Sequence, residues 1–141
     1  MATNMTNDGT QTLEQLEGNP WGDPPADASR LITTVHGLRR KPVGQLDAED
    51  LRVLLSQQVG IDALVPYALD VLDDNPLAEG DFYPGDLLKA VLELPAQYWQ
   101  QHPDHEKRIT QVVSVVASMD LDAHYAPADV IHAAIERYRS R

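Results

Sequence analysis

Apolar residues recur at helical spacing along most of this chain. The clearest case is 61–74, where six apolar side chains share one helix face and four aspartates lie largely away from it. The same periodicity predicts further helices, although the β-branched VVSVV run (112–116) leaves a strand as an alternative for the segment 103–119. The other predicted helices are 12–17, 26–40, 47–60, 87–94, a short one around 97–99, and 127–138.

Proline, glycine and capping residues separate these segments. Thr12 with Gln15, and Asp47 at the start of its segment, are typical helix caps. The three prolines and the glycine of NPWGDPP (19–25) prevent a helix or strand there. We expect the Trp21 side chain to be buried against the domain and so to hold this segment in place. The sequence therefore predicts an all-α fold, a single compact helical bundle of six or seven helices joined by short Pro/Gly turns. Residues 1–11 are expected to form a flexible N-terminal tail, and 12–141 the helical domain.

Charge changes the picture of what this domain binds. The 141 residues carry a formal charge of −11, and residues 61–106 hold ten acids against Lys89 alone. Such a field repels nucleic acid and speeds encounter with basic proteins, although an acidic surface also serves solubility alone. The chain has no cysteine, which excludes disulfides and thiolate metal sites and permits a reducing compartment. We see neither a signal peptide nor an apolar run of membrane-spanning length.

Catalytic and metal-binding patterns are weak. None of the common nucleotide-binding, metalloprotease or nucleophile-elbow motifs occurs. His102, His105 and Glu106 resemble metal ligands, but Pro103 is expected to start a helix that leaves His102 outside it. The basic run Arg39-Arg40-Lys41 is interpreted as complementing a helix dipole and pairing with nearby acids. The sequence therefore offers no convincing catalytic motif and no convincing set of metal ligands.

The turn NPLAEGDFYPGDLL (75–88) offers the best candidate binding site. Its prolines and glycines predict a rigid connector, and a purely structural role remains one interpretation. Because Phe82 and Tyr83 are adjacent, one is expected to pack beneath the turn and the other to face outward. In the second interpretation, Tyr83 anchors a basic partner among surrounding carboxylates. The candidate binding residues are Asp70, Asp73, Asp74, Glu79, Asp81, Tyr83 and Asp86.

Several stretches resemble the contact-dependent growth inhibition immunity proteins, small bacterial proteins. The similarity extends from about residue 13 to about residue 103, and the block 75–95 is its most specific part. The stretches are LEQLEGNPWGDPP (13–25), HGLRRKPV (36–43), EDLRVLLSQQVG (49–60), LVPYAL (64–69), NPLAEGDFYPGDLLKAVLELP (75–95) and YWQQHP (98–103).

The resemblance implies a cytoplasmic inhibitor that binds and neutralises a toxin domain delivered by neighbouring cells. The helical pattern itself leads us to expect a monomer when the protein is free. It implies neither catalysis nor a cofactor, and the acidic charge suits a basic toxin such as a nuclease. An acidic helical adaptor that binds another basic partner remains the alternative function. No membrane or nucleic-acid partner is expected.

Overall fold

The computed structural model describes residues 9–141, which form an all-α fold as predicted. These residues contain eight α-helices and two short 3₁₀ helices, and they contain no β-strand. The α-helices are α1 (Leu13–Glu17), α2 (Arg30–Leu38), α3 (Ala48–Ser56), α4 (Ile61–Asp74), α5 (Asp86–Leu92), α6 (Ala96–Gln101), α7 (Pro103–Ala117) and α8 (Ala128–Arg139). The 3₁₀ helices are η2 (Val43–Gln45) and η3 (Asp122–His124).

The helix ends follow the local capping chemistry. Thr12 and Gln15 form the expected capping box of α1, and Asp47 forms another with Asp50 at the start of α3. The helix predicted over 26–40 begins later, at Arg30, because the Ser29 hydroxyl accepts a hydrogen bond from the amide of Ile32. The VVSVV run is helical and belongs to α7, so the strand alternative is wrong.

The first described residues are held against the start of η2. The amide of Gly44 donates to the carbonyl of Gly9, and that of Val43 donates to Gln11, both at 2.9 Å. Residues 9–11 of the predicted tail therefore have a fixed path beside 42–44. Residues 1–8 of that tail lie outside the described residues.

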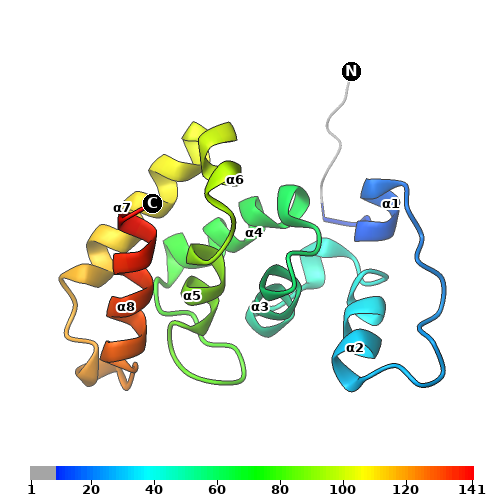
Figure 1. The fold of residues 1–141 in the computed structure, drawn as a ribbon, viewed down its shortest axis with the longest axis horizontal. Coiled ribbons are helices and arrows are strands. Elements are labelled where there is room, and N and C mark those ends of the chain that lie inside the picture. The colour runs from blue at the N-terminus through cyan, green and yellow to red at the C-terminus, as the bar shows by residue number, and fades with distance from the viewer. Residues whose placement is uncertain (1–8) are drawn as a thin grey trace.

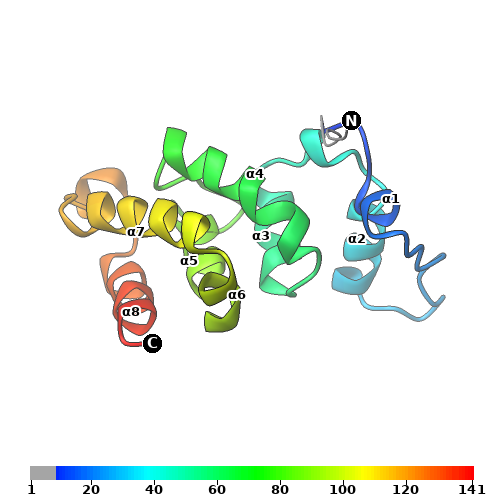
Figure 2. The same cartoon turned by 90° about the horizontal axis from the view of Figure 1, so that it is seen from above.

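The helices follow one another along an elongated molecule. In Figure 1, α1 and α2 occupy one end, α3, α4 and α5 the middle, and α7 and α8 the other end. Figure 2 shows the same order from above. Chain neighbours are also neighbours in space, with α3 packed on α2, α4 and α5, and α7 packed on α4, α6 and α8.

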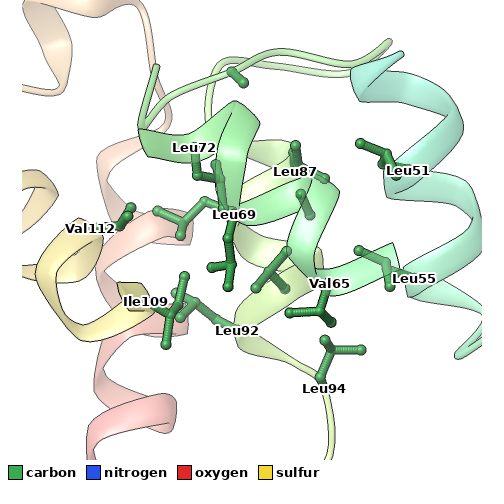
Figure 3. Packing of buried hydrophobic residues seen from close by; sticks show 14 of the residues in the cluster. Leu51, Leu55, Val65, Leu69, Leu72, Leu87, Leu92, Leu94, Ile109 and Val112 are labelled. Atoms are coloured by element: carbon green, nitrogen blue, oxygen red, sulfur yellow. The ribbon is translucent and has the colours of Figure 1, made fainter. Parts of the chain in front are cut away.

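The core lies around α4, as its strong amphipathic pattern predicts. Figure 3 shows the apolar face of α4 enclosed by side chains from α3, α5 and α7. Leu64, Val65, Ala68, Leu69 and Leu72 are all fully buried. Each buried leucine contributes about 1.5–3 kcal/mol relative to an exposed one, so this layer is a substantial source of the stability of the fold.

Trp21 is not buried, and the prediction that it anchors its segment from the interior is wrong. Its side chain is 43% exposed and lies flat over the guanidinium of Arg39, whose carbon sits 4.0 Å from the ring centroid. The buried residue here is Arg39, with 0% exposure, and it pairs with Glu14 and Glu17 of α1. The basic run thus pairs with nearby acids as expected, but one of its side chains lies inside the domain.

Candidate functional site

The structure divides the predicted binding residues between two neighbourhoods. Asp70 and Asp73 lie on α4 beside α7, where both carboxylates accept hydrogen bonds from Arg108 at 2.8 and 2.6 Å. Asp81 instead lies beside α3, because its amide donates to Glu49 at 2.9 Å. The hydrogen bonds that Arg108 donates to the carboxylates of Asp73 and Asp70 raise its pKa. One arginine therefore offsets part of the negative charge predicted for the end of α4.

Two further predicted acids face solvent. Asp74 lies in the last turn of α4 and is exposed. Glu79 is also exposed. It lies in the loop between α4 and α5 (75–85), where its backbone pairs with that of Pro84 in an isolated β-bridge. Both carboxylates are accessible to a partner.

Asp86 is not a surface residue, although the sequence analysis places it among the candidate binding residues. Only 4% of it is exposed, and its carboxylate faces back into the loop that precedes it. It accepts hydrogen bonds from the amides of Gly80 at 2.7 Å, Phe82 at 3.1 Å and Tyr83 at 3.5 Å. Asp86 therefore fixes the loop from within, much as a carboxylate satisfies amides at a helix N-terminus.

A pair of side chains from α3 holds the loop from its other side. Arg52 donates to both oxygens of Glu49 at 2.6 Å, and its Nε also lies 3.8 Å from a carboxylate oxygen of Asp86. The hydrogen bond from Arg52 is the main reason that the pKa of Glu49 is lowered. The Glu49 carboxylate in turn accepts a hydrogen bond from the backbone amide of Asp81. The loop tip is thus fastened at four backbone amides before any partner arrives.

The two aromatic residues divide their roles as the sequence indicated. Tyr83 is half-buried against the core, and this burial raises the pKa of its hydroxyl. Phe82 is 68% exposed, with the Arg52 guanidinium carbon 4.3 Å from its ring centroid. Phe82 is therefore the more exposed of the two rings, whereas the sequence interpretation names Tyr83 as the anchor.

The sequence interpretation also missed Glu49 and Arg52. Their spacing of three residues on a helix is visible in the sequence as an ordinary surface ion pair. Their contact with a loop about thirty residues further along the chain has no local signal. Only the packing of α3 beside the loop reveals it.

A second polar cluster joins α6 to α7. Tyr98, His102 and His105 stack, and the Tyr98 hydroxyl lies 2.8 Å from Nδ1 of His105. Nδ1 of His102 donates to the carbonyl of Tyr98 at 2.8 Å. Within the described part of the chain, no group of three or more His, Asp or Glu side chains converges to hold a metal ion. The two histidines that resembled metal ligands are instead placed in this aromatic stack.

This cluster predicts a loss of stability in weak acid. Burial lowers the pKa of His105, and the charges of His102 and Arg108 add to the effect while Asp104 opposes it. The unfolded chain then binds more protons as the pH falls through about 6.5, so the free energy of unfolding decreases there. We expect a lower urea midpoint at pH 5.5 than at pH 7.5. The His105→Gln variant should show a smaller difference, and an unchanged difference would contradict this assignment.

The fold and this loop define an α-helical domain that presents an exposed aromatic ring on a fixed support. None of the helices in residues 9–141 is long and apolar enough to cross a lipid bilayer. A family model described as CDI immunity proteins matches residues 15–109, which is about two thirds of the chain. The chain therefore belongs to the family of CDI immunity proteins, where CDI stands for contact-dependent growth inhibition. Comparisons with curated proteins and with solved structures found no match.

The matched region contains α2 to α6, the loop and the first turns of α7. The second half of α7 and all of α8 lie beyond it. The loop and the side chains of α3 that hold it are thus inside the part of the chain that defines the family.

Proposed function

We propose that this protein is an immunity protein that neutralises one cognate toxin domain by forming a stoichiometric complex with it. The family match over residues 15–109 carries the proposal. The partner is a basic protein domain, such as a nuclease, since the chain has a formal charge of −11. The protein is a cytoplasmic monomer until it meets the toxin domain, and it works by binding rather than by catalysis.

The fixed loop supports this mode of action. Binding costs less free energy when the recognition element is already ordered, and aromatic side chains are frequent hot spots of protein interfaces. Four backbone amides of residues 80–83 are held by Asp86 and Glu49, and Phe82 projects from that support. The acids Asp74, Glu79 and Asp81 then steer the basic partner toward the loop.

Charge reversal tests the steering. Changing Asp74, Glu79 and Asp81 together to lysine should slow association with the toxin domain encoded beside this gene by about tenfold or more at low salt. The difference from the unaltered protein should shrink as salt rises, because ions screen exposed charges. The measurement is a series of association rates at several ionic strengths.

The matched control reverses three exposed acids on or next to η3 and α8, Asp122, Asp129 and Glu136, which lie beyond the family match. It changes the net charge equally and should slow association less. Equal slowing by both triple variants would show that only net charge matters and that the loop is not the docking surface.

A further inference from the structure

An open groove lies between α2, α3 and the loop tip, on the side of the loop away from α7. It encloses about 540 Å³, within the size range of pockets that bind ligands in proteins. Its apolar lining comes from Leu31 and Leu38 of α2, Val53 of α3, and Phe82. The groove therefore combines two helices with the fixed loop.

Large apolar side chains are unusually exposed around this groove. Leu31, which lines the groove, is 42% exposed, and so is the next residue, Ile32, which lies outside the lining, although α2 has a buried face that includes Val35. Phe82 adds the most exposed aromatic ring of the loop, at 68%. Contiguous exposed apolar surface with a polar rim is typical of protein interaction sites.

The charges at the rim fall into two classes. Glu49 is paired with Arg52, and Asp50 is paired with Lys41 at 2.9 Å. Asp81 and Arg30 also line the groove, and among residues 9–141 neither forms an ion pair. A partner that enters the groove therefore meets one acid and one base that form no direct ion pair, although the charge of Asp81 also acts on the nearby guanidinium of Arg52.

We infer that the toxin domain inserts an apolar element into the groove between α2, α3 and Phe82, with a basic group opposite Asp81 and an acidic group opposite Arg30. The inference rests on the proposed function and names the surface that performs it. Phe82 and Leu31 supply the apolar contact, because both are exposed and held on rigid supports. Asp81 and Arg30 fix the orientation, because each charge attracts only one sign of partner.

Binding kinetics with the toxin domain encoded beside this gene test the inference. Phe82→Ala should raise the dissociation constant at least about 30-fold, mainly through faster dissociation, as expected for an interface hot spot. Leu31→Ala should raise it about fivefold or more. Tyr125→Ala and Val130→Ala are the matched controls, since these residues are 89% and 37% exposed on or beside α8. Both controls should bind as the unaltered protein does.

Arg30→Glu separates this docking geometry from simple attraction between opposite net charges. Steering alone would make the more acidic variant associate faster with a basic toxin. Insertion into the groove predicts weaker binding instead, through faster dissociation, because two acids then face each other.

The outcomes for groove and function are distinguishable. If the unaltered protein binds the toxin domain and both Phe82→Ala and Leu31→Ala bind equally well, the groove inference is overturned and the proposed function stands. If the unaltered protein, shown to be folded by circular dichroism, does not bind, the proposed function fails and the inference fails with it.

Discussion

Replacing Arg39 with alanine is expected to lower the free energy of unfolding by about 3–5 kcal/mol. The side chain is fully buried, with one nitrogen 2.5 Å from Glu17 and another 3.6 Å from Glu14. It also donates to the carbonyl of Asn19 at 3.0 Å and supports the ring of Trp21. Truncation leaves Glu17 without its cation, leaves Glu14 with Arg40 alone, and opens a cavity beneath the 19–25 segment, so the attachment of α1 and this segment to α2 is weakened.

This effect is measured by comparing urea unfolding of the Arg39→Ala variant with that of the separate Arg40→Ala variant. Arg40 is the adjacent arginine, exposed and paired with Asp23, and its removal should leave the unfolding midpoint almost unchanged. Arg39→Met should recover part of the loss because it restores buried volume. A loss below about 1 kcal/mol for Arg39→Ala would show that the guanidinium is not a structural centre.

Replacing Asp86 with alanine is the second large effect, expected to lower the free energy of unfolding by about 3 kcal/mol. Three backbone amides lose their acceptor at once, and Arg52 loses a neighbouring carboxylate. The loop tip should then open locally more often than the helices do. Hydrogen exchange at the amides of Gly80, Phe82 and Tyr83 should accelerate in the variant.

Asp81→Ala is the matched control for Asp86→Ala. Asp81 is an exposed carboxylate in the same loop, and no hydrogen bond to its side chain fixes the backbone of residues 80–83. Its removal should leave both the unfolding midpoint and loop exchange near those of the unaltered protein. If Asp86→Ala exchanges as slowly as Asp81→Ala, the loop is held by its prolines and glycines rather than by the buried carboxylate.

Local signals predicted the helices well because their causes are local. The capping boxes at Thr12 and Asp47 and the apolar face of 61–74 depend on residues only a few positions apart. The start of α2 was predicted four residues too early, since helical spacing continued through Ala26 and Ala28 while Ser29 provided the cap. The all-α class followed from these signals without any tertiary information.

The candidate site was harder to predict because its contacts are long-range. Asp86 has the sequence signature of an exposed acid at a helix start, yet it lies inside the loop because the chain turns back over it. The sequence places Asp70 and Asp73 on an acidic helix face with no nearby cation. In the structure Arg108, more than thirty residues further along the chain, donates hydrogen bonds to both carboxylates. Long-range contacts also explain why Arg39 is buried and Trp21 is partly exposed. Two carboxylates pair with the Arg39 guanidinium inside the domain, and the Trp21 ring covers it from outside.

The central claim is neutralisation of a toxin domain by complex formation, and titration of toxin activity tests it most directly. The toxin domain encoded beside this gene is mixed with increasing amounts of the purified protein, and both its activity and the mass of the complex are measured. Neutralisation by complex formation predicts that activity falls linearly to zero at one molecule per toxin domain, with a complex of matching mass. Full toxin activity in the presence of excess folded protein would contradict it.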